Sequence, residues 1–221
     1  MRQFIFDFNG TLFQDTPLHL RTWRDFMALH GVLITEEIFY SEMCGPPNDA
    51  ILRHFLGDHL TDAQIEQMSF EKESMYRRIV INDPSLQALT PGAEALLDEL
   101  KTRKIPFAIA TSSRFDNVKF YMETLRIDRW FDYDHICYAD GTLPGKPDPA
   151  IYLQAMKKLC YTPGDVIVVE DALPGVQSAA AAGVGRIIAI DTTMGPEAFE
   201  GVDGVDAVVH DFWDFERFLQ D

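Results

Sequence analysis

The N-terminal segment Arg2-Gln3-Phe4-Ile5-Phe6-Asp7-Phe8-Asn9-Gly10-Thr11-Leu12 joins a short apolar run to a carboxylate. The apolar run over residues 3–6, with a glycine soon after it, predicts a buried strand. Asp7 follows this strand directly, and open parallel sheets bind their ligands at the carboxyl ends of their strands. The segment therefore predicts a functional carboxylate at one edge of a parallel sheet.

The composition indicates a globular protein with an acidic surface. The chain has 221 residues, of which 47% are hydrophobic, enough for one good-sized domain or a core with an insert. Its 19 Lys and Arg stand against 35 Asp and Glu, a net charge of −16. Because such a surface repels phosphate backbones and anionic lipids, nucleic-acid and membrane partners are disfavoured.

The cysteines and the hydropathy favour a cytoplasmic location. The odd number of widely spaced cysteines (Cys44, Cys137 and Cys160) matches no zinc pattern or disulfide framework, and predicts reduced thiols. No apolar run approaches the roughly 20 residues of a membrane span, and the chain enters its first strand without a signal peptide. We expect a monomer, and the sequence leaves a dimer open.

Two regions with different patterns of predicted secondary structure indicate two domains. Residues 14–84 show helical patterns only, with a capping box at Thr61-Asp62-Ala63-Gln64, and predict an all-helical insert. Residues 1–13 and 85–221 alternate strand and helix patterns, which predicts an α/β core with a doubly wound parallel sheet. The expected strands of this core are residues 3–6, 105–110, 166–169, 186–190 and 207–209, with a final helix over 212–219.

Four polar clusters share a position in this predicted core. Asp7, Thr111 and the pair Glu170-Asp171 each follow an apolar strand, and Lys146 lies in a loop before a helix. We therefore expect them to converge at the carboxyl edge of the sheet. Three acids in one site require a cation, and hard oxygen ligands without His or Cys select Mg²⁺.

The same edge can bind an anion. The Thr111 hydroxyl and the backbone N–H groups of Ser112 and Ser113, near a helix N-terminus, would receive phosphate oxygens, and Lys146 adds a positive charge. A carboxylate nucleophile, Mg²⁺, a lysine and hydroxyl donors together describe phosphoryl transfer.

In order, these clusters resemble the four motifs of the haloacid dehalogenase superfamily. The matching segments are Asp7-Phe8-Asn9-Gly10-Thr11, Thr111, Gly145-Lys146-Pro147-Asp148-Pro149 and Glu170-Asp171-Ala172-Leu173-Pro174-Gly175. The helical insert after the first motif resembles the family's C1 cap. Within the superfamily the chain is similar to the β-phosphoglucomutase and small-phosphatase branch, which implies a Rossmann-like core and a small phosphorylated metabolite as substrate.

The resemblance implies a role for each matching residue. Asp7 would be the nucleophile and form an aspartyl-phosphate. Mg²⁺ would bind Asp7, the main-chain carbonyl of Asn9 and Asp171, with Glu170 binding directly or through water. Thr111 and Lys146 would hold the phosphoryl oxygens, helped by the N–H of Gly10, and the cap would exclude water.

Asn9 departs from the family pattern, in which a second Asp protonates the leaving oxygen. An amide cannot do this, although it keeps the backbone carbonyl. Because general acid–base catalysis contributes about 10²–10⁴-fold, we expect slow turnover of ordinary phosphate esters. Acyl and aryl phosphates, whose leaving groups need no proton, should suffer less. The sequence leaves open whether Asn9 is natural or was introduced to trap the phospho-enzyme.

The insert departs from the sugar-phosphate mutases. Their cap carries an Arg for a distal phosphate, whereas Met43-Cys44-Gly45-Pro46-Pro47-Asn48-Asp49 has none, and Asn48 occupies the matching position. His19 matches a cap residue that reaches toward the acid–base Asp. We take His19 and Asn48 as candidate substrate-binding residues, and hypothesise that His19 partly replaces the missing acid.

Three alternatives remain beside this reading. One is a non-catalytic module that binds a sugar phosphate. A phosphonatase would need a cap lysine as Schiff base, but Lys72, the only lysine of the insert, lies in a charged helix rather than a loop that would face Asp7. A haloacid dehalogenase needs no metal, so the Glu170-Asp171 pair argues against it.

Overall fold

The chain forms two compact units. The computed structural model describes residues 2–213 and 215–219, and divides into Met1–Gln14 with Ala88–Asp221 and, separately, Asp15–Gln87. We call these the core unit and the helical unit. Each unit has its own buried apolar cluster, so each is described by itself.

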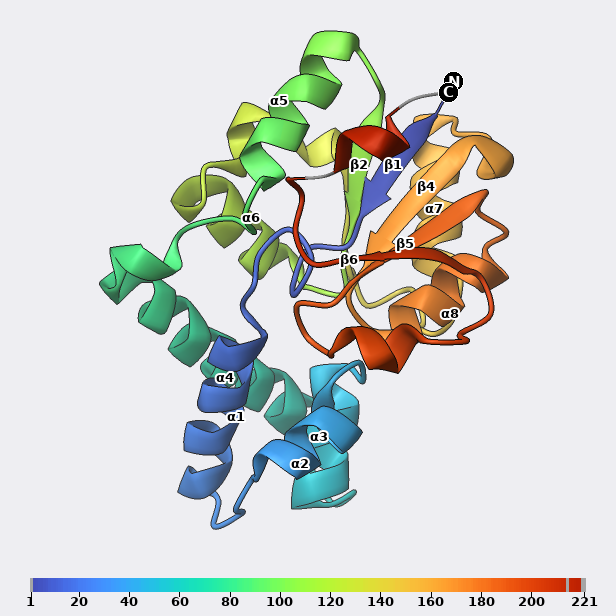
Figure 1. The fold of residues 1–221 in the computed structure, drawn as a ribbon. Helices are drawn as coiled ribbons and strands as arrows, with labels where there is room; N and C mark the ends of the chain where they lie inside the picture. The colour runs from blue at the N-terminus through green and yellow to red at the C-terminus, as the bar shows by residue number, and fades with distance from the viewer. Residues whose placement is uncertain (1, 214, 220–221) are drawn as a thin grey trace. The chain divides into compact units, whose positions relative to one another are not determined.

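The core unit is built on a six-stranded parallel sheet in the order β3-β2-β1-β4-β5-β6 (Figure 1). Its strands are β1 (Gln3–Phe6), β2 (Phe107–Ala110), β3 (Ile136–Cys137), β4 (Val166–Glu170), β5 (Arg186–Ile190) and β6 (Val205–Val209). The chain winds outward in both directions from the centre, so the strand order reverses between β1 and β4, where such sheets bind ligands. The prediction of a doubly wound α/β core is confirmed.

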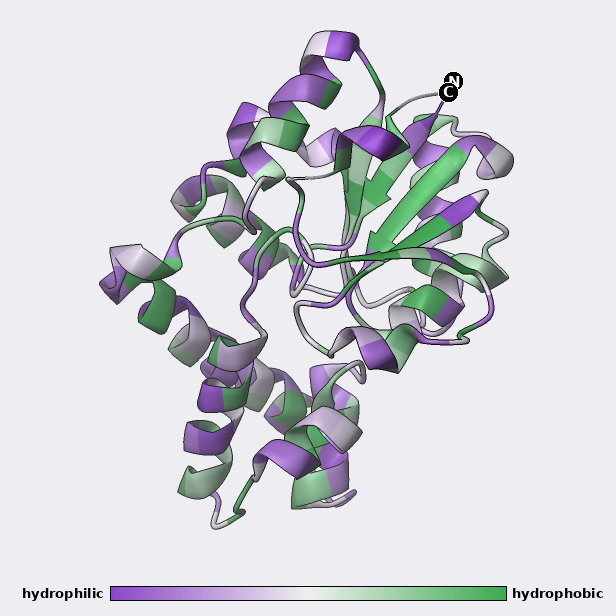
Figure 2. Cartoon of the chain, viewed as in Figure 1, coloured by the Kyte–Doolittle hydropathy of each residue, from purple (hydrophilic) through white to green (hydrophobic). Residues whose placement is uncertain are grey.

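Alternating side chains of β1 explain how helices come to cover both faces. Ile5 packs with residues of α7 (Ala150–Leu159) and α8 (Leu173–Ala181). Phe4 and Phe6 point to the opposite face, where they contact Phe215 and Phe212. On that side of the sheet lie α5 (Ala93–Arg103) and α6 (Phe115–Thr124) (Figure 1). The strands of the sheet are mostly apolar, as Figure 2 shows.

The helical unit contains α1 (Thr16–Leu29), α2 (Glu36–Ile38), a π-helical segment (Phe39–Met43), α3 (Asn48–Leu56), α4 (Asp62–Asn82) and a 3₁₀ turn (Pro84–Leu86). The expected capping box opens α4, with the Thr61 and Gln64 side chains and backbones bonded reciprocally. All of Asp15–Gln87 is described, and it contains no strand, as predicted. No helix of the described residues is long and apolar enough to cross a membrane.

Several element predictions were wrong. The strand β3 was missed because it is only two residues long and is recognisable only through its pairing with Ile109 and Ala110. The strand expected from residue 105 begins at Phe107, and β6 begins at Val205 rather than residue 207.

The helix expected over 212–219 is instead a 3₁₀ helix over Phe215–Phe218, and residue 214 lies outside the described residues. Phe212, Phe215 and Phe218 contact one another in turn, and this spacing of three fits a 3₁₀ helix.

Candidate active site

Asp7, Glu170 and Asp171 meet where the strand order reverses. Asp7 is the first residue after β1, and its N–H donates to the carbonyl of Val169 on the neighbouring β4 at 3.0 Å. Glu170 ends β4 and Asp171 follows it. All three carboxylates are buried. The sequence prediction that they converge at one edge agrees with this geometry.

Lys146 joins the cluster from the loop before α7. Its Nζ donates to Asp7 Oδ1 at 2.6 Å, to Glu170 Oε1 at 2.5 Å and to the carbonyl of Ala110 at 3.3 Å. Burial alone would lower the pKa of Lys146, but the carboxylates of Asp7 and Glu170 raise it above its usual value. Lys146 is therefore a permanent cation.

One ammonium does not balance three carboxylates. Burial raises the pKa of Asp7 well above its usual value, and the charges of Glu170 and Asp171 add to this, although Lys146 opposes it. Burial, followed by the charge of Glu170, also raises the pKa of Asp171 to about 7. The site thus has an excess of buried negative charge, which a cation would relieve.

Two threonines hold Asp171. Thr11 Oγ1 donates to Asp171 Oδ1 at 3.2 Å, and Thr193, in the loop after β5, donates to Asp171 Oδ2. The glycine between β1 and Thr11 is required, because a Cβ on Gly10 would lie 2.0 Å from Asp171 Oδ2 and its φ is +76°. Gly10 is thus needed for the close approach of the two loops.

Glu170 is held by its own set of partners. Tyr152 on α7 donates its hydroxyl to Glu170 Oε1 at 2.7 Å, and the Asp171 N–H donates to Oε2 at 3.1 Å. Gly175 at the start of α8 packs so closely that an added Cβ would lie 1.9 Å from the Glu170 carboxyl. Burial raises the pKa of Tyr152 well above its usual value, so its hydroxyl stays protonated and can donate.

The carboxylates fit a divalent cation. Asp7, Glu170 and Asp171 each offer one oxygen, and these oxygens all lie within 4.8 Å of one another. A set of buried carboxylate oxygens suits a hard cation such as Mg²⁺, Mn²⁺ or Ca²⁺. When bound, the cation would supply positive charge for a phosphoryl group, next to Lys146.

Thr111, Ser112 and Ser113 follow β2 on the other side of Asp7. The Thr111 N–H donates to the carbonyl of Cys137 at 2.9 Å, and its Oγ1 accepts from the Ser113 N–H at 3.1 Å. Thr111 is buried, whereas Ser112 is exposed. Ser113 Oγ donates to Asn9 Oδ1 at 2.7 Å, and Thr111 Oγ1 lies 3.4 Å from the same oxygen. Asn9 thereby links the first and second motifs.

His19 and Asn48 lie in one polar cluster of the helical unit. Lys72 Nζ donates to His19 Nδ1 at 2.9 Å and to Glu73 Oε1 at 2.8 Å, and Asn48 Nδ2 donates to the same Glu73 oxygen at 2.8 Å. Lys72 lies on α4, in a helix rather than a loop as expected, and it is 1% exposed. The buried Lys72 and the partly buried Glu73 thus form an ion pair between the two candidate residues.

The lysine determines the state of the His19 ring. An ammonium has no acceptor, so Nδ1 must accept from Lys72 and the imidazole must be neutral with its proton on Nε2. Nε2 lies 3.3 Å from Asp15 Oδ2, which also accepts from the Tyr76 hydroxyl at 2.5 Å. For His19 to supply a proton to a substrate, as hypothesised, its Nε2–H would have to leave Asp15.

Sequence reasoning missed several residues that touch the predicted ones: Ser113 as a side chain, Tyr121, Tyr152, Thr193 and Glu73. The tyrosines occupy buried positions of α6 and α7, where the helical pattern alone indicates core packing. Thr193 follows β5 at the same sheet edge, and this position was a usable signal.

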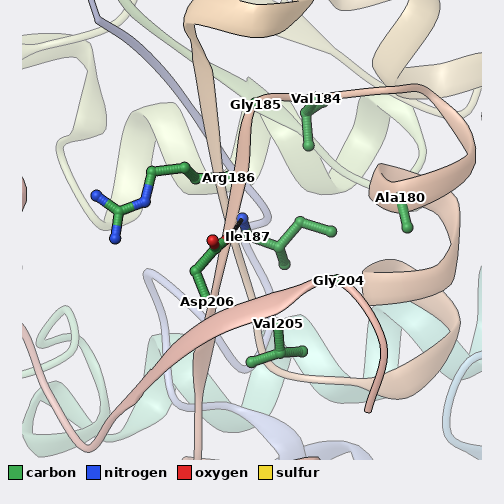
Figure 3. Close-up of a pocket in the computed structure, with 8 residues that line it drawn as sticks. All are labelled: Ala180, Val184, Gly185, Arg186, Ile187, Gly204, Val205 and Asp206. Carbon is green, nitrogen blue, oxygen red and sulfur yellow. Dashed lines mark hydrogen bonds between the residues drawn. The ribbon is translucent and has the colours of Figure 1, made fainter.

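A cavity of about 400 Å³ lies elsewhere. It is lined by the end of α8 and the starts of β5 and β6, including Gly185, Arg186, Gly204 and Asp206 (Figure 3). These strand starts are at the edge opposite Asp7 and Asp171. The cavity therefore contains none of the candidate catalytic residues.

The chain is similar to known hydrolases and phosphatases. A family model described as "Hydrolase: haloacid dehalogenase-like hydrolase" matches residues 1–183. The chain is 30% identical to hexitol phosphatase A of Escherichia coli, covering 94% of this chain and 89% of the relative. It is 28% identical to a phosphorylated carbohydrates phosphatase of Thermotoga maritima, covering 86% and 85%.

A solved structure is similar to this chain over nearly its whole length. A family IA, variant 3 hydrolase from Entamoeba histolytica is 36% identical, with a TM-score of 0.87 and coverage of 96% of this chain and 94% of that one.

We predict that Mg²⁺ binding weakens as the pH falls below about 7. The pKa of Asp171 is raised to about 7, and that of Asp7 is also raised. Below these values the cation must displace a proton, whereas above them the carboxylates are already ionised. With one proton displaced, the Kd should rise about tenfold per pH unit. Calorimetry at pH 6, 7 and 8 in buffers of different ionisation enthalpy measures both Kd and proton release.

Asp203→Asn removes an exposed carboxylate outside the cluster and serves as the control, while Asp171→Asn should abolish the pH dependence attributed to Asp171. A Kd that stays constant from pH 6 to pH 8, with no proton released, would contradict the prediction.

We predict that Lys72→Met lowers the free energy of unfolding by about 3–5 kcal/mol, because it leaves the Glu73 carboxylate buried without its cation. Lys72→Met/Glu73→Gln should recover part of this loss, since no unpaired charge remains. Urea denaturation followed by far-UV circular dichroism measures the difference. Arg78→Met, an exposed position on the same helix, is the control. Equal losses for Lys72→Met and Arg78→Met would refute the buried ion pair.

Proposed function

The chain belongs to the haloacid dehalogenase-like hydrolases, and from this we propose that it is a Mg²⁺-dependent phosphatase or phosphotransferase. Its substrate is a small phosphorylated metabolite such as a sugar or polyol phosphate. The names of the relatives, a hexitol phosphatase and a phosphorylated carbohydrates phosphatase, support this substrate class. The reaction passes through an aspartyl-phosphate on Asp7.

One observation carries the proposal: Asp7 is bonded to Lys146 and lies within a buried cluster of three carboxylates. A lone buried aspartate would be protonated and a poor nucleophile. Here a permanent ammonium and a cation held by Asp7, Glu170 and Asp171 would keep Asp7 ionised. Mg²⁺, when bound, would neutralise negative charge on the phosphoryl group.

The reaction would proceed in two displacements. An Asp7 carboxylate oxygen forms a bond to phosphorus while the bond to the leaving oxygen breaks, and that oxygen takes a proton from solvent. Water, or an acceptor hydroxyl in a phosphotransferase, then attacks phosphorus and loses its proton to solvent, which releases Asp7. Lys146 and the Thr111 hydroxyl stabilise the phosphoryl oxygens during both steps.

The helical unit favours a substrate with one phosphate rather than two. The stretch 43–49 has no arginine, and Asn48 at the matching position is bonded to the Glu73 carboxylate. A second phosphate bound at this cluster would find no unpaired cation, because Lys72 is already paired with Glu73. Hydroxyl groups would instead find acceptors and donors in Glu73, Asn48 and His19. This supports a phosphatase over a bisphosphate-dependent mutase.

Two other reactions receive less support. A phosphonatase needs an unprotonated lysine as nucleophile, whereas Lys72 is buried and paired with Glu73. A dehalogenase that works without metal has no need of Glu170 and Asp171 beside Asp7. A non-catalytic module that binds a sugar phosphate is the remaining alternative, and turnover separates it from the proposed enzyme.

We predict that Asp7→Asn lowers kcat for p-nitrophenyl phosphate by roughly a thousandfold or more, because an amide cannot form the aspartyl-phosphate. Wild-type turnover should require Mg²⁺ and should stop when the metal is chelated. Release of p-nitrophenolate is followed by absorbance, with Asp203→Asn as the control. Absence of Mg²⁺-dependent turnover would disprove the proposed enzyme and favour the binding module, whereas turnover that survives Asp7→Asn would show that Asp7 is not the nucleophile.

We predict that the wild-type protein prefers leaving groups that need no proton. The kcat/KM for p-nitrophenyl phosphate and acetyl phosphate should exceed that for glucose 6-phosphate by about 10²–10⁴-fold, the usual contribution of a general acid. Phosphate release from the three substrates, measured at one pH and one Mg²⁺ concentration, gives the ratio. Comparable values for all three would mean that another group supplies the proton.

A further inference from the structure

Asn9, in the core unit, belongs to a closed ring of hydrogen bonds among three side chains. We call this the hydrogen-bond ring. Its Nδ2 lies 2.8 Å from the Tyr121 hydroxyl, which lies 3.1 Å from Ser113 Oγ, which in turn lies 2.7 Å from Asn9 Oδ1. Tyr121 comes from α6 and is 1% exposed. Its ring stacks on Phe8, with centroids 4.3 Å apart, so the hydroxyl has little freedom to move away.

An amide completes this ring. The Asn9 Nδ2–H donates to the Tyr121 hydroxyl, the Tyr121 O–H donates to Ser113 Oγ, and the Ser113 O–H donates to Asn9 Oδ1. Each group then gives one hydrogen and receives one. The ring also closes if the amide is turned over, because every donor and acceptor then exchanges its role.

A carboxylate cannot complete the same ring. It only accepts, so the Tyr121 and Ser113 hydroxyls would both donate to it, and no hydrogen would remain for the bond between them. The surroundings of position 9 therefore suit an amide and work against the usual acid–base carboxylate.

We infer that Tyr121 and Ser113 are positioning residues for the Asn9 amide, and that this site operates with an amide at position 9. Asn9 is then an integral part of the protein rather than an isolated replacement of an acid. The kinetic consequence rests on the proposed function: the introduction of a carboxyl at position 9 restores acid catalysis only when the ring is also opened. The positioning itself does not depend on any activity.

The test compares wild type, Asn9→Asp, Tyr121→Phe and Asn9→Asp/Tyr121→Phe. Asn9→Asp alone should raise kcat/KM for glucose 6-phosphate by less than about tenfold at pH 7. The double variant should raise it about tenfold further, since the carboxyl is then released from one of the two hydroxyls that hold it.

A second measurement needs no turnover. In ¹⁵N-labelled protein, Tyr121→Phe and Ser113→Ala should each shift the side-chain NH₂ signals of Asn9 and speed their exchange with water by at least about tenfold. Tyr121→Phe keeps the aromatic ring that stacks on Phe8, so the fold should survive. Tyr133→Phe, a half-exposed tyrosine of the core unit, is the matched control and should change neither readout.

The outcomes separate the two proposals. Unchanged Asn9 signals in Tyr121→Phe and Ser113→Ala, or equal changes in Tyr133→Phe, would overturn the ring. A full 10²-fold gain from Asn9→Asp alone, with no further effect of Tyr121→Phe, would overturn its kinetic consequence. If no variant turns over any phosphate, the proposed function fails, while the amide signals still decide whether the ring exists.

Discussion

The core unit is organised around three buried carboxylates that share a single ammonium. Lys146 bonds to Asp7 and Glu170, yet the pKa values of Asp7 and Asp171 remain raised because burial and mutual repulsion outweigh it. Such a cluster survives only when each acid is held by donors. Thr11, Thr193 and Tyr152 supply them, and the close approach of Gly10 and Gly175 makes room for the acids. A bound cation would balance the negative charge that Lys146 leaves uncompensated in this cluster.

In the helical unit, the charged groups of the polar cluster are one lysine and one glutamate, which form an ion pair. The buried Lys72 is paired with the partly buried Glu73, and His19 and Asn48 are bonded to Lys72 and Glu73 respectively. Burial alone would raise the pKa of Glu73, but the charge of Lys72 and the hydrogen bonds from Asn48 and Lys72 bring it far below its usual value. Because the charges cancel, this cluster needs no added ion. It instead presents oxygen and nitrogen atoms of both polarities, which suits neutral hydroxyl groups better than a second phosphate.

Local patterns predicted what depends on local chemistry. The buried run before Asp7, the capping box at Thr61 and the apolar strand before Glu170 each carry their own signal, and the order of parallel strands then brings their polar ends together. The two-residue strand β3 and the contact of Tyr121 with Asn9 depend on pairing between segments far apart in the chain. A buried tyrosine in a helix looks like core packing until its hydroxyl is found beside an amide.

The contacts of Asn9 with Tyr121 and Ser113 indicate why an amide occupies this position. In the sequence it is a single departure from a motif, and a lost acid or an introduced trap explains it equally well. A carboxylate at this position would take the hydrogens of both hydroxyls and leave none for the contact of 3.1 Å between Tyr121 and Ser113. An amide in either orientation leaves one hydrogen for that contact. Three carboxylates that could hold a metal ion lie together, while position 9 carries an amide in place of a carboxylic acid, and that combination suits phosphoryl transfer from leaving groups that depart without a proton.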